Sequence, residues 1–74
     1  MTRHSVEAIV TGRVWKVEVG VGSHVAEGDT LLILESMKME IPIESPVTGR
    51  VEEICVAVED PVDEGQIVAI VAAL

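Results

Sequence analysis

The residue with the clearest chemical potential is Lys38, which lies between Met37 and Met39 in the stretch LESMKME. Apart from Met1 these are the only methionines, and Lys38 is one of two lysines. A lysine in a turn is ordinarily a solvated charge, and a methionine is ordinarily a flexible core residue. Two methionines around a lysine in a polar turn need another explanation. We interpret Lys38 as a candidate covalent attachment point, and a partner-recognition tip is the alternative.

Other residue types that carry chemistry are sparse. Cys55 is the only cysteine, so neither an internal disulfide nor a thiolate metal site can form within the chain. His4 and His24 have no partner at a metal-ligand spacing, and no nucleophile with an orienting group accompanies them. We therefore expect no catalytic residue and no metal site.

The composition favours β-structure and disfavours nucleic acid as a partner. Valine and isoleucine dominate the apolar residues, and Trp15 is the only aromatic residue. A net charge of −8 without a basic stripe repels phosphate backbones. We interpret the acidity as a solvated surface, with steering toward a basic partner as the alternative. No apolar run is long enough to cross a bilayer and no secretory leader is evident, so we expect a cytoplasmic protein without a membrane partner.

An internal repeat organises the chain. Shifted by half of the 74 residues, residues 10–34 align without a gap on residues 47–71. Eleven of the 25 aligned pairs are identical, including every pair in the run from Val10–Val14 over Val47–Val51. Such self-similarity indicates one structural unit that occurs twice. We therefore expect a single domain, residues 1–74, made of two matched halves.

Each half is predicted to form four short strands and no helix. Gly12 and Gly49 begin strands, and apolar residues at alternate positions over 17–21 and 54–58 predict half-buried continuations. The last strands are expected at 30–35 and 67–72, after turn signals at Glu27–Asp29 and Glu64–Gln66. Packed face to face, the two halves would bury their apolar sides in an all-β flattened barrel or sandwich with pseudo-twofold symmetry.

The segment between the halves is predicted to be a hairpin with Lys38 at its tip. Apolar and acidic residues alternate over 40–44, so the turn must be tight. It lacks the Asn-Gly or Asp-Gly of short hairpins, which indicates a conformational cost often accepted at functional sites. Met37 and Met39 cannot both point into a core from this tip, so at least one thioether should be exposed. Pro42 removes a ladder donor, which predicts an edge strand.

The motif ESMKME, residues 35–40, in a hairpin midway through a valine-rich repeat resembles the attachment motif of biotinyl domains, the biotin carboxyl carrier family. The resemblance covers essentially the whole chain. It implies two four-stranded antiparallel sheets, with Lys38 on an exposed hairpin tip and biotin bound covalently to it. It also implies that Met37 and Met39 form the recognition surface around the lysine. Ser36 departs from the commoner alanine, which leaves the assignment intact.

The same resemblance implies a non-catalytic carrier. A biotin protein ligase would acylate Lys38, and the arm would carry carboxyl groups between a biotin carboxylase and a carboxyltransferase. Freeing an ordinary lysine amine of its proton at neutral pH costs about 4 kcal/mol, and no base accompanies Lys38, so activation must come from the ligase. Glu35, at a commonly acidic position of the family, is a candidate ligase contact; a role in solubility is the alternative.

Two other functions stay open. Lipoyl domains share the fold but typically carry Asp-Lys-Ala or Asp-Lys-Val at the tip, and small free-standing attachment proteins accept either group. The chain could therefore be a lipoyl carrier, or accept both groups, for a dehydrogenase or glycine-cleavage-type system. In the remaining alternative Lys38 stays unmodified and the chain is an interaction domain.

Three positions that break the repeat carry structural expectations. Glu59 replaces Gly22, so a positive φ is either lost or costly in the second half. Cys55 replaces Glu18 on the solvent side of a strand, which predicts an exposed thiol. Trp15, which the repeat pairs with a glutamate, is expected to be partly exposed on a sheet face.

Overall fold

The computed structural model describes residues 2–74, and this part of the chain contains eight β-strands and no helix. The strands are β1 (Arg3–Glu7), β2 (Gly12–Val17), β3 (His24–Val25), β4 (Thr30–Ser36), β5 (Met39–Glu44), β6 (Gly49–Ile54), β7 (Pro61–Val62) and β8 (Ile67–Ala73). Side chains branched at Cβ favour this extended backbone because their rotamers fit the pleated sheet. The strands predicted at 30–35 and 67–72 are each one residue longer than expected.

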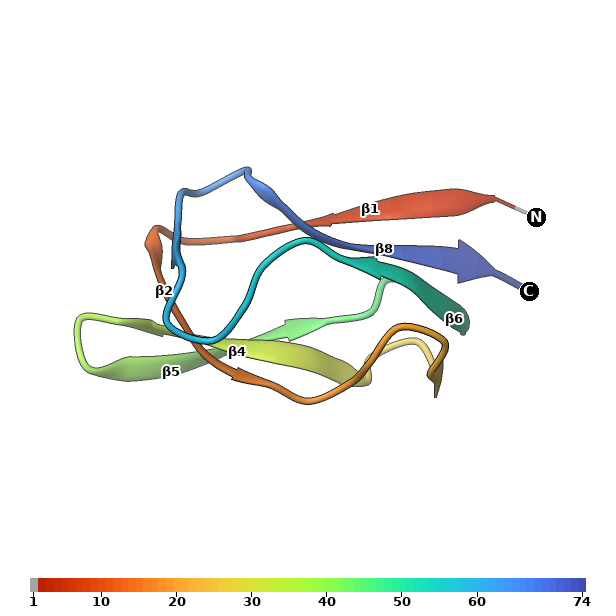
Figure 1. Cartoon of the computed structure of the whole chain (residues 1–74), viewed down its shortest axis with the longest axis horizontal. Coiled ribbons are helices and arrows are strands. Elements are labelled where there is room, and N and C mark those ends of the chain that lie inside the picture. The colour runs from red at the N-terminus through yellow and green to blue at the C-terminus, as the bar shows by residue number, and fades with distance from the viewer. Residues whose placement is uncertain (1) are drawn as a thin grey trace.

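The strands form two four-stranded sheets, and every strand pairing is antiparallel. The terminal sheet has the order β1-β8-β6-β3, and the hairpin sheet has the order β5-β4-β2-β7. Figure 1 shows the two sheets lying one above the other. The buried apolar side chains of both sheets form one core cluster. The predicted all-β sandwich is therefore confirmed.

A twofold relation connects the two sheets. β2, β3 and β4 begin and end 37 positions before β6, β7 and β8. The sheets do not coincide with the two halves of the sequence, because each half contributes two strands to each sheet. The expectation that one half packs face to face on the other is therefore wrong. The halves are interleaved, and strand pairing holds them together as well as apolar packing.

Glycine at the start of β2 and β6 permits close contact between strands. A β-carbon at Gly49 would lie 1.9 Å from the backbone oxygen of Ala72, and one at Gly12 would lie 2.5 Å from that of Glu35. Only glycine fits at such distances. The pairing of Gly49 with Ala73 and the approach of Gly12 to Glu35 therefore depend on these two residues.

The core lies between the sheets and is built from residues that the repeat relates to one another. The largest fully buried side chains are Leu31, Leu32, Leu34, Val14, Val51, Val68 and Val71. Leu31 and Leu34 of β4 correspond to Val68 and Val71 of β8. β-Branched and aliphatic side chains without polar atoms fill the interior, which gives the hairpin a rigid base.

The predicted half-buried continuations of the second strands are correct for burial at the first valine and wrong for strand structure. β2 ends at Val17 and β6 at Ile54. Val19 is half-buried and Val56 is buried, whereas Val21 and Val58 are exposed by 68% and 49%. In the first loop the Gly22 amide donates to the Val51 carbonyl at 2.8 Å. One more bond to β4 follows the end of β2, from the Glu18 amide to the Leu31 carbonyl at 2.9 Å; beyond it the backbone at Gly22 and Ser23 bonds to β6 of the opposite sheet, which ends the ladder of β2.

The positive φ of this loop is kept in both halves. φ is 93° at Gly22 and 80° at Glu59. The conformation has therefore not been lost with glycine, and the second half holds a glutamate in the left-handed region. Of the two expected outcomes, loss of the positive φ or its retention at a conformational cost, the second is observed.

The molecule is elongated, with principal extents of 36 × 18 × 18 Å. The turn between β4 and β5 lies at one end, and the two chain ends lie together at the other (Figure 1). There the Ala73 amide donates to the Thr2 carbonyl at 2.8 Å. The described residues include no helix long and apolar enough to span a membrane.

Candidate functional site

Lys38 lies in the two-residue turn between β4 and β5. Ser36 pairs with Met39, which leaves Met37 and Lys38 as the central residues. Their φ angles are 51° and 66°, both positive, as in the type I′ turn that matches the twist of a hairpin. Asparagine and glycine are the usual residues in such a turn, so methionine and lysine hold it at a conformational cost. The predicted tight tip is confirmed.

The three side chains at the tip extend into solvent. Met37 is 93% exposed and Met39 is 64% exposed, so both thioethers face outward. Lys38 is exposed as well, and none of the ion pairs found within residues 2–74 includes it. Apolar side chains as exposed as this are adaptable contacts for a partner.

Two contacts anchor the base of the turn to β2 and the segment before it. The Ser36 hydroxyl donates to the Thr11 carbonyl at 3.0 Å. The Arg13 guanidinium donates to Glu35 Oε1 at 3.1 Å. Glu35 therefore points along the outer face of the hairpin sheet and is half exposed, with its charge matched by Arg13.

Arg13 is a contributor that the sequence did not reveal. Glu35 lies opposite Glu40 in the β4–β5 ladder, and like charges at such positions repel. Arg13, on the neighbouring strand β2, offsets that repulsion. The repeat held one signal. The arginine occurs in both halves, as Arg13 and Arg50, whereas the glutamate occurs in one, because the residue equivalent to Glu35 is Ala72.

The descending strand β5 is an edge strand, as Pro42 predicted. Ile43 is buried, Ile41 is half-buried, and Glu40 and Glu44 face solvent. The alternation therefore fixes the register of the hairpin, because a slip by one residue would bury the glutamates. Proline and acidic residues also disfavour pairing of this edge with another chain.

The other chemistry-bearing residues lie apart from the tip. Cys55 is exposed and unpaired, as predicted, just after β6 of the terminal sheet. His4 lies on β1 and His24 on β3, both strands of the terminal sheet. Residues 2–74 contain no cluster of three or more potential metal ligands. Trp15 is 44% exposed, which confirms its expected position at a sheet surface.

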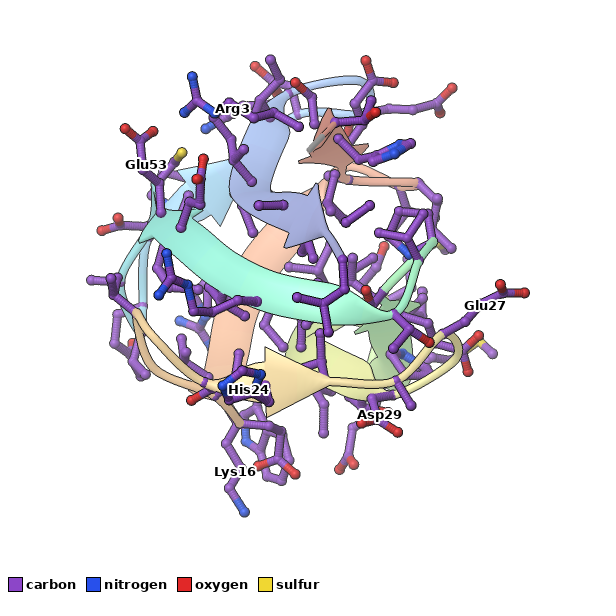
Figure 2. All side chains as sticks on the ribbon, turned by 90° about the vertical axis from the view of Figure 1, so that its right-hand side faces the viewer. Arg3, Lys16, His24, Glu27, Asp29 and Glu53 are labelled. Atoms are coloured by element: carbon purple, nitrogen blue, oxygen red, sulfur yellow. The ribbon has the colours of Figure 1, made fainter. Side chains whose placement is uncertain are left out.

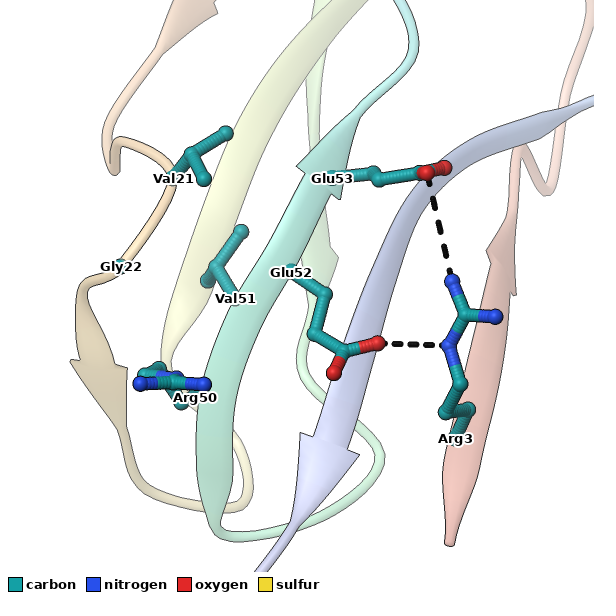
Figure 3. A pocket seen from close by; sticks show the side chains of 7 residues that line it. All are labelled: Arg3, Val21, Gly22, Arg50, Val51, Glu52 and Glu53. Carbon is teal, nitrogen blue, oxygen red and sulfur yellow. Dashed lines mark hydrogen bonds and ion pairs between the residues drawn. The ribbon is translucent and has the colours of Figure 1, made fainter.

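A shallow depression of about 400 Å³ lies on the terminal sheet. Its lining consists of Arg3, Val21, Gly22, Arg50, Val51, Glu52 and Glu53 (Figure 3). Arg3 bonds to Glu52 and lies 4.0 Å from Glu53, so three of the four charged groups of the lining are paired with one another, whereas none of the ion pairs found within residues 2–74 includes Arg50. The lining comes from β1, β6 and the loop before β3, not from the β4–β5 hairpin, and the depression is therefore separate from Lys38.

The arrangement at the tip can present an amine but cannot activate it. None of the hydrogen bonds and ion pairs found within residues 2–74 brings an acid or base to Lys38. An exposed primary amine can accept an acyl group that another protein has activated. The tip is therefore suited to covalent attachment, and Lys38 fits a group carried through an amide bond.

Comparison with known proteins gives consistent results. A family model for biotin/lipoyl domains, described as "Biotin-requiring enzyme", matches residues 5–71. The "Biotinylated protein TB7.3 homolog" of Mycolicibacterium smegmatis is 53% identical over 38 residues, which are 51% of this chain and 54% of that protein. The "Biotin/lipoyl attachment protein" of Bacillus subtilis is 53% identical over 34 residues, 46% of this chain and 47% of that protein.

These alignments span about half the length of both relatives. Among solved structures, the urea carboxylase of Kluyveromyces lactis contains a region that superposes with a TM-score of 0.92 at 33% identity. That match covers 97% of this chain and 6% of the carboxylase chain.

Proposed function

This chain belongs to the family of biotin/lipoyl attachment domains, and on that premise we propose that it is a biotin carboxyl carrier in which Lys38 bears the biotin. A domain of this family carries its group and is not itself a catalyst. The observation that carries the proposal is the display of Lys38 between two exposed thioethers in a strained two-residue turn. We further propose that residues 1–74 act as one carrier domain.

Lys38 acts as a nucleophile toward an acyl group activated by a biotin protein ligase. Its Nζ attacks the carbonyl carbon of biotinyl-adenylate, the C–N bond forms, AMP leaves with the C–O electron pair, and an amine proton passes to solvent. The amide removes one positive charge from the tip. Met37 and Met39 provide the apolar contacts that the ligase recognises, and Glu35, held by Arg13, provides an acidic contact beside them.

The partners that we propose after acylation are a biotin carboxylase and a carboxyltransferase, and the similarity to a urea carboxylase supports this class. When bound, biotin supplies a ureido nitrogen that takes up and gives up a carboxyl group. The chain itself places the tip at the end of an elongated, rigid sandwich and so raises the effective concentration of the group at each partner.

Biotin is favoured over lipoate by the two methionines at the tip. Lipoate remains the alternative because a matching relative carries the name biotin/lipoyl attachment protein. We place the carrier in the cytoplasm, where ATP is available to a ligase and an exposed thiol such as Cys55 stays reduced.

Intact-mass measurement after co-expression with either a biotin protein ligase or a lipoate ligase tests the proposal. We expect the mass to rise by one biotin with the first ligase. Lys38→Ala should keep the melting temperature and abolish the adduct. Lys16→Ala is the matched control, because it removes the only other lysine and should be modified like the wild type.

Three outcomes would contradict the proposal. An adduct on the Lys38→Ala protein would refute the site. Modification by the lipoate ligase alone would favour the lipoyl carrier. An unchanged mass beside an active biotin protein ligase would favour an unmodified interaction domain.

A further inference from the structure

The twofold relation provides an internal comparison between the outer faces of the two sheets. Positions 37 apart occupy equivalent places in the fold, so folding makes similar demands on both. On the hairpin sheet such positions carry Trp15, Ile33 and Pro42, and on the terminal sheet they carry Glu52, Ile70 and Ser5. In two of the three pairs, Glu52/Trp15 and Ser5/Pro42, the residue is polar on the terminal sheet and apolar on the hairpin sheet, which bears Lys38. Folding alone does not explain that difference.

Strand register places Trp15, Ile33 and Pro42 side by side. Ile33 of β4 lies opposite Pro42 on one side and opposite Lys16 on the other, and a bulge at Trp15 interrupts the β2–β4 ladder. Both residues of such a bulge oppose one residue of the partner strand. We call the surface formed by Trp15, Ile33 and Pro42 the Trp15 face.

The equivalent bulge on the terminal sheet confirms which way these side chains point. Arg3 contacts both Glu52 and Glu53, the counterparts of Trp15 and Lys16, on the outer surface (Figure 3). Trp15 and Lys16 therefore share the outer surface of the hairpin sheet. Trp15 is 44% exposed and Pro42 is exposed, while Ile33 is half-buried. The largest side chain of the molecule thus lies open on the sheet that carries the attachment hairpin.

The charges around the Trp15 face are predominantly acidic. Four carboxylates and two cations surround it, namely Glu18, Glu35, Glu40 and Glu44 with Arg13 and Lys16. Figure 2 views the molecule from the end opposite the tip and shows Lys16 extending outward from the side of the hairpin sheet. A complementary partner therefore has an apolar centre and a rim rich in lysine and arginine.

We propose that the Trp15 face docks the enzyme that acylates Lys38, a protein with an apolar patch rimmed by basic residues. The proposal rests on the proposed function. Before acylation there is no arm, so the active site of that enzyme must reach Nζ itself, and its contacts must lie on the hairpin or the adjoining surface. β4 and β5 run directly from the tip to Ile33 and Pro42. A half-exposed tryptophan on the sheet that carries the tip is the type of residue that dominates binding at such contacts.

Steady-state acylation by a purified biotin protein ligase with biotin and ATP tests the proposal. The critical pair is Ile33→Glu and Ile70→Glu, because the two isoleucines are equivalent in the fold and both half-buried. Ile33→Glu should lower kcat/KM about tenfold, mainly through KM, because tenfold corresponds to about 1.4 kcal/mol of lost contact. Ile70→Glu should leave kcat/KM unchanged. Trp15→Glu should act like Ile33→Glu, and it should fold because Glu52 occupies the equivalent position.

The outcomes separate the two proposals. If the wild type is acylated and Ile33→Glu, Ile70→Glu and Trp15→Glu all match it, docking at the Trp15 face is refuted while the carrier function stands. If the wild type is not acylated, the carrier function fails and docking fails with it. Should the glutamate variants unfold, Ile33→Thr and Ile70→Thr give the same comparison. A wild type that is dimeric in sedimentation, with a monomeric Ile33→Thr, would assign the face to a second copy and overturn the proposal.

Discussion

Glu59→Gly is expected to stabilise the protein. Glu59 holds a φ of 80° in a loop whose counterpart has Gly22 at 93°. A β-carbon in the left-handed region costs about 1–2 kcal/mol, whereas glycine costs about 0.5–1 kcal/mol in chain entropy. The difference leaves a gain of about 0.5–1 kcal/mol in the free energy of unfolding. The ion pair that would be lost, Arg13–Glu59 at 3.6 Å, contributes little because the Glu59 side chain is 73% exposed.

The reciprocal change, Gly22→Glu, isolates the backbone. A β-carbon at Gly22 would meet no atom within 4 Å, so the substitution adds strain without a clash. We expect it to destabilise by about the same 0.5–1 kcal/mol. Thermal unfolding should show shifts of about 2–8 °C in opposite directions, since a domain of this size moves about 4–8 °C per kcal/mol. Urea unfolding with an unchanged m-value would confirm that both variants unfold in the same way.

Glu59→Ala is the control, because it removes the carboxylate and keeps the β-carbon. We expect no gain in stability from it. If Glu59→Ala stabilises as much as Glu59→Gly, then removal of charge from an acidic protein explains the effect. If Glu59→Gly lowers the melting temperature, or Gly22→Glu leaves it unchanged, backbone strain does not distinguish the two loops and the reasoning is refuted.

Two further predictions follow from the backbone. Gly49→Ala should lower the free energy of unfolding by about 2–3 kcal/mol, because its β-carbon would meet the Ala72 backbone oxygen and force β6 from β8. Denaturant titration checks this, and a loss no larger than that of Gly12→Ala would count against it. Met37→Asn should raise stability by about 0.5–1 kcal/mol by relieving a φ of 51°. It should slow acylation of Lys38 about tenfold, so a variant that is both more stable and equally reactive would exclude thioether recognition.

The repeat and the alternation of residues allowed much of the fold to be predicted. They located the strands that begin at Gly12 and Gly49, the last strand of each half, and the tight turn at Lys38. They could not show that the halves interleave. A repeat of 37 residues is compatible both with sheets that each come from one half and with sheets that both halves share. Which strands pair depends on contacts between distant residues, such as Gly49 with Ala73.

The same limit applies at the candidate site. Lys38, Met37 and Met39 were found because the motif is local and contiguous. Arg13 was missed because its contact with Glu35 joins residues 22 positions apart on neighbouring strands. The end of β2 at Val17 was missed because the loop after it bonds to β6 of the opposite sheet. Local periodicity contains no information about such partners.

The hydrogen bond between Thr2 and Ala73 makes the fold nearly a closed ring. Under the twofold relation Thr2 is equivalent to Met39 and Ala73 is equivalent to Ser36, the two residues that pair at the base of the attachment turn. A two-residue connection between them would form a second hairpin, and the ring could then be opened at another loop to give a circular permutant. A permutant with Met-Lys as that connection would display a lysine at each pole of the sandwich. Conversely, a sequence fused to the present ends begins at the pole opposite Lys38.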